Sequence, residues 1–323
     1  MPDLVRGAGS GARVLAVCPN PTIDIWCEAK SVHPVHKIRT NKEVYDPGGG
    51  GTNVARVITE LGGNAEVVSM AGGVMGSLLG ELLGEQGIKC TIVPIADRTR
   101  VSYTVHDVSS GFEYRFVSPG PTVEPAEVEA CLAEVRKAEF DYLVASGSLP
   151  PGVPSDFFLA LSGIAAQKDA RFVLDTSGDA LLRTLREGHV FLAKPSIGEL
   201  SAYSGEELDE TSARDAAIKL VHDGCADMIA VSMGSRGAML AFDNKIVRAA
   251  APIVNARSTV GAGDSFLGAI VWALANGKSA EEALAFGVAA GAAAVLAPGT
   301  KLCQRADVER FHGRLPTPTA HEA

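Results

Sequence analysis

Short apolar runs alternate with longer amphipathic segments along most of the chain. The runs are rich in Val, Ile, Leu and Ala, as buried strands are, and they lie at 14–18, 66–70, 142–146, 172–175, 191–194 and 228–232. Apolar positions recur with helical spacing in the intervening segments 53–61, 78–86, 125–138, 156–167, 180–186 and 212–222. Strands that alternate with helices predict an α/β fold of three layers, in which helices cover both faces of a mainly parallel sheet.

Two regions depart from this alternation and predict a small second sheet. Residues 24–45 have mixed polarity without a helical period, and residues 100–117 contain two apolar stretches around a Ser-Ser-Gly turn, the pattern of a β-hairpin. The strands of this sheet are expected roughly within 22–45 and 100–118. Their open edges need covering or pairing, so we expect a lid over the active site or a contact with a second copy. No long linker or repeat divides the chain, which predicts a single domain over 1–323 with a flexible tail at 315–323.

The composition is that of a soluble globular protein, with 46% hydrophobic and 21% charged residues. The net charge of -9 argues against nucleic-acid binding, because phosphate backbones select basic surfaces. An anionic substrate must then be bound by a few local cations. The six cysteines form no CxxC pair, which indicates reduced thiols and a cytoplasmic location. Residues 1–12 lack the apolar centre of a signal peptide, and the apolar stretch 283–297 is too short to cross a bilayer.

A glycine-rich turn in the C-terminal part carries the strongest chemical signal. Residues 258–265 read STVGAGDS and lead into an apolar run at 266–274. Glycine lets the backbone approach a ligand closely, and the free amides of a helix N-terminus attract phosphate. A carboxylate there can accept a proton while the adjacent amides hold an oxyanion. The arrangement suits phosphoryl transfer to a hydroxyl, and the alternative is an ordinary glycine-rich turn that starts a helix.

A second glycine cluster reads PGGGGTNVAR at 47–56. Four consecutive glycines remove side chains from the backbone just before a predicted helix, so a sugar or phosphate can approach closely, and Asn53 is available to bond hydroxyl groups. The alternatives are a flexible turn and a dinucleotide fingerprint. Flexibility beside a regular helix costs entropy without a visible return. A dinucleotide site requires a strand that leads straight into the glycines, which the sequence does not clearly offer.

The two clusters, in this order, resemble the paired signatures of the ribokinase-like (PfkB) carbohydrate kinases. The similarity runs from about residue 14 to residue 303. Three further segments resemble the phosphosugar-kinase branch, namely EYRFVSPG at 113–120, SGSLPPGV at 146–153 and FGVAAG at 286–291. Within that branch, the four-glycine form and the YRFV segment resemble the minor bacterial 6-phosphofructokinases more than the 1-phosphofructokinases. The resemblance implies a ribokinase-like fold with a β-sheet lid.

The activity that the resemblance implies is ATP-dependent phosphorylation of fructose 6-phosphate at its 1-hydroxyl, a step of glycolysis. Asp264 holds the family position of the general base, and Gly261, Ala262 and Gly263 hold positions whose amides stabilise the transferring phosphoryl group. Kinases for fructose 1-phosphate and tagatose 6-phosphate are the nearest alternatives, because they differ in a few hydroxyl contacts. A sugar-phosphate sensor without catalysis is the alternative from another class.

On the sugar side, Asp24 matches an early acidic residue of the family that bonds sugar hydroxyls. Arg100 and Arg115 match basic positions near the phosphosugar, where guanidinium forks suit phosphate oxygens, although Arg115 also fits an ordinary surface arginine. Lys37 and Arg39 fall in the lid and are expected to complete the phosphate site, in a homodimer formed through the lids. This number of cations favours a sugar phosphate as the substrate. The resemblance also places four further residues against it, namely Gly49, Gly50, Asn53 and Ser148.

On the nucleotide side, KPSIGEL at 194–200 resembles the family element KPNxxEL, whose Glu organises water around the magnesium of ATP. Glu199 holds that position, while Ser196 replaces the usual Asn and has a shorter reach. SMGSRGA at 232–238 resembles a turn beside the nucleotide. The expected ATP contacts are Lys194, Ser196, Ser232, Gly234, Gly237 and Thr259. Carbonyl groups at Ser258, Val260, Ala297 and Gly299 match a potassium site of some relatives.

Overall fold

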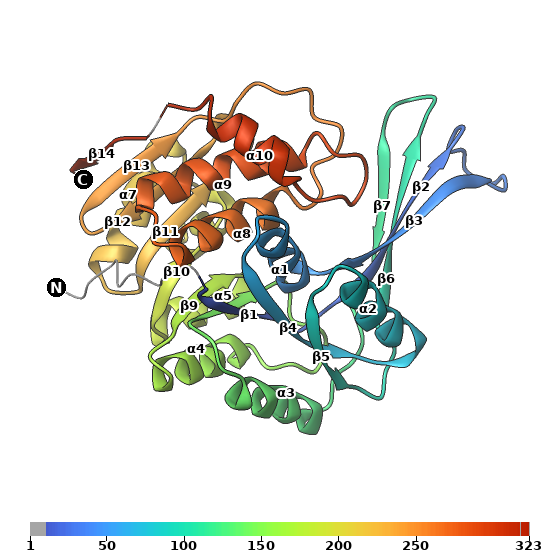
Figure 1. The fold of residues 1–323 in the computed structure, drawn as a ribbon, viewed down its shortest axis with the longest axis horizontal. Coiled ribbons are helices and arrows are strands. Elements are labelled where there is room, and N and C mark those ends of the chain that lie inside the picture. The colour runs from blue at the N-terminus through green and yellow to red at the C-terminus, as the bar shows by residue number, and fades with distance from the viewer. Residues whose placement is uncertain (1–10, 317, 323) are drawn as a thin grey trace.

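A ten-stranded sheet forms the centre of the structure, a computed structural model that describes residues 11–316 and 318–322 (Figure 1). In spatial order its parallel strands are β5 (Lys89–Pro94), β4 (Asn64–Ala71), β1 (Arg13–Cys18), β8 (Tyr142–Ser146), β9 (Arg171–Asp175), β10 (Val190–Ala193) and β11 (Ala226–Ser232). Antiparallel strands extend the β11 edge, namely β12 (Ala238–Phe242), β13 (Lys245–Ala249) and β14 (Ala320–Glu322).

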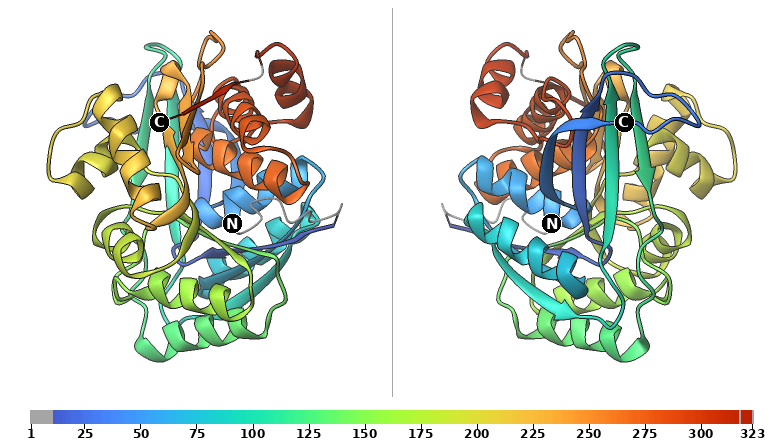
Figure 2. Two further views of the ribbon diagram at one scale, coloured as in Figure 1. Left: turned by 90° about the vertical axis from the view of Figure 1, so that its left-hand side faces the viewer. Right: turned by 90° about the vertical axis from the view of Figure 1, so that its right-hand side faces the viewer.

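Helices cover both faces of this sheet (Figure 2). A separate hydrophobic core lies on each face. One face packs against α1 (Gly50–Glu60), α2 (Gly73–Glu85), α8 (Ala262–Ala275), α9 (Ala280–Ala294) and α10 (Arg305–His312). The other packs against α3 (Pro125–Lys137), α4 (Phe157–Gln167), α5 (Gly178–Glu187), α6 (Ile197–Ser204) and α7 (Glu210–His222). Helices α8 and α9 are buried on almost all sides, and small residues let them approach. A Cβ at Gly287 would lie 2.6 Å from Ile270.

A separate four-stranded sheet forms the lid and extends beyond the helical layers (Figure 1). Its strands, in spatial order, are β3 (Thr40–Gly48), β2 (Thr22–Ala29), β6 (Arg100–Asp107) and β7 (Glu113–Val117). Alternate residues of a strand point to opposite faces. Asp24, Ser102 and Val117 stand in register on the face that lies over the cleft described below. Tyr103 and Phe116 are paired on the opposite face, where both are exposed.

The predicted three-layer α/β architecture is confirmed, and each predicted strand and helix forms within a few residues of its expected bounds. The apolar stretch 283–297 falls mainly in α9. Within the described residues, no helix has the length and hydropathy needed to cross a membrane. The tail 315–323 is predicted to be flexible, but Ala320–Glu322 pairs with β13, so main-chain hydrogen bonds order part of it. Residues 317 and 323, and residues 1–10 of the expected leader-free N-terminus, lie outside the described part.

Candidate active site

A cleft of about 370 Å³ lies under the lid, at the carboxyl ends of the central strands. This edge of a parallel sheet is where α/β proteins bind ligands. The cleft brings together many of the predicted residues, namely Asp24, Gly49, Gly50, Asn53, Arg100, Arg115, Ser148, Glu199, Thr259, Val260, Gly261 and Asp264. Residues of the wall that the sequence does not predict are Thr22, Ser102, Val117, Ser146, Gly147, Asp175, Thr176 and Ser177.

Asp264 lies in the first turn of α8, where the helix meets the cleft. The helix begins after Gly261, whose φ of 69° favours glycine, and no side chain caps its first amides. Asn53 Nδ2 donates to Asp264 Oδ2 at 2.8 Å. Burial raises the pKa of Asp264 to about 6, the carboxylate of Asp175 adds to this, and the Asn53 bond and the Lys194 charge oppose it. The carboxylate is therefore oriented and has the pKa of a useful base.

A buried chain of polar groups connects Asn53 to the lid. Arg56 Nη1 donates to Asn53 Oδ1 at 3.3 Å, and Arg56 Nη2 donates to Asp46 Oδ1 at 3.1 Å. The side chains of this ion pair are only 10% and 14% exposed, so salt screens it weakly. Thr300 Oγ1 donates to the other oxygen of Asp46 at 2.7 Å. Neither Arg56 nor Asp46 is predicted from the sequence. Arg56 could have been identified from its spacing, because it follows Asn53 by one helical turn and so lies on the same side of the helix.

Lys194 and Asp175 form a buried ion pair near Asp264. Lys194 Nζ lies 3.0 Å from Asp175 Oδ1, and Ser146 Oγ donates to the other oxygen of Asp175 at 3.1 Å. Burial lowers the pKa of Lys194, but the carboxylates of Asp175 and Asp264 outweigh it and raise the pKa overall, so the ammonium stays charged. Asp175 is not among the predicted site residues. It ends a predicted buried strand at the ligand-binding edge, which is a signal that could have identified it.

The two arginines on the sugar side have different partners. Arg100 donates to the carbonyl of Ser118 at 2.8 Å and to that of Asn20 at 2.9 Å, so much of its guanidinium holds the chain together. Arg115 lines the cleft without a hydrogen bond or ion pair to any residue the structure describes. The structure therefore favours Arg115 as the cation free to meet a phosphate. Burial raises the pKa of Asp24 to about 6, although three nearby arginines oppose this.

Lys37 and Arg39 do not reach the cleft of their own chain. Both are exposed in the segment between β2 and β3, and neither belongs to the cleft wall. A role in phosphate binding would require a second copy or a movement of the lid. Ser148, in contrast, is held in the wall, because Asn20 Nδ2 donates to its Oγ at 3.1 Å.

Ser196 begins α6 as an N-cap. Its Oγ accepts from Glu199 N at 3.2 Å, and Ser196 N donates to Glu199 Oε2 at 2.7 Å, which together form a capping box. This capping box explains why a serine suits the position where the family has Asn. It also means that the hydroxyl expected to contact ATP already accepts a hydrogen bond from the main chain. Glu199 still lines the cleft, and Ser196 forms a main-chain bridge with Ser232.

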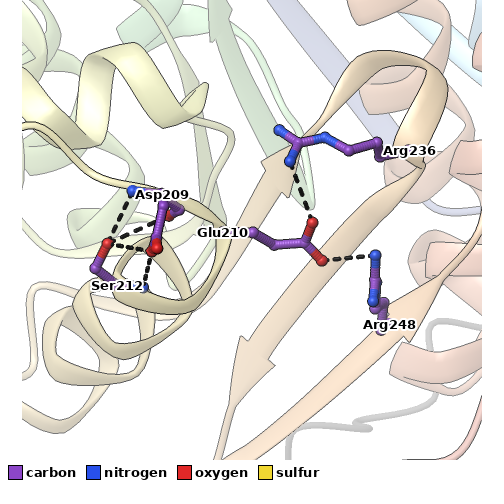
Figure 3. A network of polar contacts seen from close by, with 5 residues as sticks. All are labelled: Asp209, Glu210, Ser212, Arg236 and Arg248. Carbon is purple, nitrogen blue, oxygen red and sulfur yellow. Dashed lines mark hydrogen bonds and ion pairs between the residues drawn. The ribbon is translucent and has the colours of Figure 1, made fainter.

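The predicted nucleotide-side turn is fastened by ion pairs at the surface (Figure 3). Glu210 accepts from Arg236 at 3.3 Å and lies 2.6 Å from Arg248, which ties the turn and β13 to the start of α7. Gly234 and Gly237 take positive φ values of 60° and 96° in this turn, outside the residues that line the cleft. The network therefore fixes the backbone of the turn, while its contact with nucleotide stays a prediction.

Two main-chain segments beside the cleft, 257–260 and 295–300, are joined by a hydrogen bond from Arg257 N to Val295 O at 2.7 Å. We call them the cation segments. They contain the predicted potassium carbonyls of Ser258, Val260, Ala297 and Gly299. Among residues 11–316 and 318–322, no donor bonds to these four carbonyls, so they fit the ligand set of a monovalent cation.

The carboxylates of the cleft suit a metal ion that is bound together with ATP rather than by the protein alone. The described residues contain no group of three or more His, Cys, Asp or Glu that could hold a metal ion. Glu199 is one of four carboxylates in the cleft wall, and the other three are Asp24, Asp175 and Asp264. A carboxylate that acts through water fits magnesium that arrives with ATP phosphates and keeps most of its waters.

Fold and cleft together match one class of enzyme. The chain belongs to the pfkB family of carbohydrate kinases, whose sequence profile matches residues 18–307. This confirms the predicted family. The chain is 43% identical to the ATP-dependent 6-phosphofructokinase isozyme 2 of Mycobacterium tuberculosis (strain ATCC 25618 / H37Rv) over 310 residues, 95% of this chain and 91% of that protein. It is 30% identical to a 1-phosphofructokinase of Haloferax volcanii, over 91% of this chain and 95% of the relative.

Solved structures agree with this assignment and confirm the ribokinase-like fold. The crystal structure of phosphofructokinase-2 from Escherichia coli in complex with potassium has a TM-score of 0.90 at 38% identity, covering 94% of this chain and 99% of that chain. Other structures of that E. coli protein contain fructose-6-phosphate or represent its tetrameric inhibited form.

Proposed function

We propose that the chain transfers a phosphoryl group from ATP to the 1-hydroxyl of fructose 6-phosphate, with Asp264 as the general base. The observation that carries this proposal is the carboxylate of Asp264, held by Asn53 at 2.8 Å beside the uncapped start of α8. Asp264 takes the hydroxyl proton while the sugar oxygen bonds to the γ-phosphorus and the bond to ADP breaks. The amides of Gly261, Ala262 and Gly263, together with Lys194, stabilise the charge on the phosphoryl group.

Two features support a sugar phosphate as the acceptor. Arg115 lines the cleft with its guanidinium uncommitted among the described residues, which suits the 6-phosphate. Asp24 faces the same space and suits sugar hydroxyls. Similarity to a 6-phosphofructokinase at 43% identity, against 30% for a 1-phosphofructokinase, favours fructose 6-phosphate over fructose 1-phosphate.

The proposed cofactors are magnesium, bound with ATP, and potassium. Glu199 would hold magnesium through water, and the magnesium would neutralise charge on the ATP phosphates. The carbonyls of the cation segments would bind potassium beside the start of α8. We place Ser232, Gly234, Gly237 and Thr259 on the nucleotide side of the same site. Lys194 and Ser196 complete this set.

The proposed active form is a cytoplasmic homodimer joined through the lids. Tyr45, Tyr103 and Phe116 form one row across the outer lid face, 44%, 47% and 59% exposed, and such aromatic faces favour association. All six cysteines are free, which agrees with a reducing compartment. Sedimentation of the unmodified protein and of Tyr103→Asp tests this. A monomeric unmodified protein, or a dimer that persists in Tyr103→Asp, contradicts the lid contact.

A substrate panel tests the proposed reaction. ADP release is measured with fructose 6-phosphate, fructose 1-phosphate and tagatose 6-phosphate, with and without KCl, and Asp264→Asn serves as the inactive control. We expect the highest kcat/KM for fructose 6-phosphate. A higher kcat/KM for fructose 1-phosphate or tagatose 6-phosphate would show that fructose 6-phosphate is not the preferred substrate. Sugar binding without ATP turnover would favour a sugar-phosphate sensor.

A further inference from the structure

Three residues on the inner face of the lid contact the cation segments. Glu113 on β7, Asp46 on β3 and Trp26 on β2 come from three different strands. Their partners, Ser258, Thr300 and Gly299, all lie within 257–260 or 295–300. The lid therefore touches both segments that carry the free carbonyls.

The Glu113 contact reaches directly into the turn before α8. Ser258 Oγ donates to Glu113 Oε2 at 3.0 Å, and the same Oγ accepts from Val260 N at 3.3 Å. Ser258 is 4% exposed, so water competes little for either bond. Because the Ser258 hydroxyl donates its hydrogen bond to Glu113, a lone pair of the same oxygen is left to accept from the amide of Val260. Gly261, the N-cap of α8, is the next residue, so a lid carboxylate sets the backbone on which Asp264 depends.

The other two contacts hold the second cation segment. A Cβ added at Gly299 would lie 2.5 Å from the Trp26 ring, so the indole lies directly against this backbone. Trp26 Nε1 is buried and donates to no described residue. Thr300 Oγ1 donates to Asp46 at 2.7 Å, and Asp46 continues through Arg56 to Asn53. Asp264 is thus connected to the lid from both sides.

We propose that Glu113, Asp46 and Trp26 are positioning residues that couple the lid to the cation segments, so that sugar phosphate and monovalent cation each strengthen binding of the other. The proposal rests on the proposed function, because it assumes that fructose 6-phosphate binds under the lid and potassium at the free carbonyls. A sugar phosphate held by Arg115 and Asp24 stabilises the closed lid. The closed lid stabilises the carbonyl arrangement through the three contacts, and linkage makes the effect reciprocal.

Calorimetry without ATP measures this coupling independently of turnover. The Kd of fructose 6-phosphate is determined in KCl and in choline chloride at equal ionic strength. We expect the Kd to be about tenfold lower in KCl, within the usual range of coupling between two sites. A Trp272→Phe background leaves Trp26 as the single tryptophan, and its fluorescence follows binding of KCl. Fructose 6-phosphate should lower the KCl midpoint by the same factor.

Variants identify the contacts that carry the coupling. Glu113→Ala removes the acceptor of Ser258, and Thr300→Val removes the bond to Asp46 while leaving the Arg56 pair in place. Each should reduce the KCl effect on the sugar-phosphate Kd to less than about threefold. Glu43→Ala is the matched control, since the Glu43 hydrogen bonds lie within the lid, and it should retain the full effect.

The outcomes separate this inference from the proposed function. Binding of KCl with an equal Kd for fructose 6-phosphate in both salts overturns the coupling, as does a full effect retained in Glu113→Ala and Thr300→Val. Phosphorylation of fructose 6-phosphate in the same preparations would leave the proposed reaction standing in either case. Absence of fructose 6-phosphate binding in both salts would overturn both.

Discussion

Replacing Asp264 by Asn should remove activity and raise stability at the same time. The pKa of Asp264 is about 6 in the fold and 3.8 as its ordinary value, because burial and the neighbouring Asp175 disfavour the charge. A difference of about 2 in pKa corresponds to about 3 kcal/mol. Since the folded pKa is the higher one, the folded state holds the proton more tightly. The contribution of Asp264 to the free energy of unfolding is therefore fully present below about pH 4. It is lost as the pH rises to about 6, and it stays lost above that.

The Asn variant keeps the shape and the contact but not the charge. Its carboxamide oxygen still accepts from Asn53, so the hydrogen bond seen at 2.8 Å is retained. We expect its free energy of unfolding to exceed that of the unmodified protein by up to about 3 kcal/mol near pH 8, and by nearly nothing below pH 4. Turnover should fall by about 10²–10⁴, the usual contribution of a general base.

Urea unfolding at several pH values, together with steady-state ADP release, measures both effects. Asp24 also has a pKa of about 6, so the difference between the two proteins isolates Asp264 better than either profile alone. Asp215→Asn, on the exposed side of α7, is the control and should leave the pH dependence unchanged. A variant less stable by the same amount at every pH would refute the raised pKa, and near-normal turnover would refute the role of Asp264 as base.

Three other changes give further predictions. Gly51→Ala places a Cβ 2.5 Å from a β1 carbonyl and should lower the free energy of unfolding by about 1–3 kcal/mol. Gly84→Ala, in the exposed part of α2, places its Cβ in open space and should raise that free energy by about 0.5–1 kcal/mol. Urea unfolding measures both. Arg115→Ala should raise the KM for sugar phosphate by about 10–100-fold with little change in kcat, and an unchanged KM would contradict phosphate binding there. Lys194→Met leaves Asp175 unpaired and should lower stability by about 3–5 kcal/mol along with kcat, so normal thermal unfolding would contradict the buried pair.

Most of the architecture could be predicted from the sequence, because burial imposes a period on each element. The runs at 14–18 and 142–146 are apolar except for Ser146, since β1 and β8 are covered on both faces. Strands with weaker patterns are less predictable. β13 lies near an edge with alternating exposure, and β14 forms only because a neighbouring strand offers unpaired main-chain groups.

The positions of the candidate site were largely predictable, but the partners of each side chain were not. Arg100 and Arg115 both match basic positions near the phosphosugar, yet the first bonds carbonyls of distant loops and the second bonds no described residue. Ser196 looks like a weakened ligand, yet it caps a helix. Partner choice depends on segments that meet only after folding, and neither periodicity nor local motif spacing contains that information.

The link from the lid to Asp264 illustrates this limit most clearly. Thr300 and Asp46 are 254 positions apart, and Asn53 and Asp264 are 211 apart, yet both bonds belong to one continuous polar chain. Buried polar groups must find partners, so each residue of the chain fixes the next. In the proposed reaction Asp264 is the base, and its position then depends on the lid through this chain. Catalytic geometry and sugar binding are then two properties of one hydrogen-bonded structure, and a change at Asp46 should alter both.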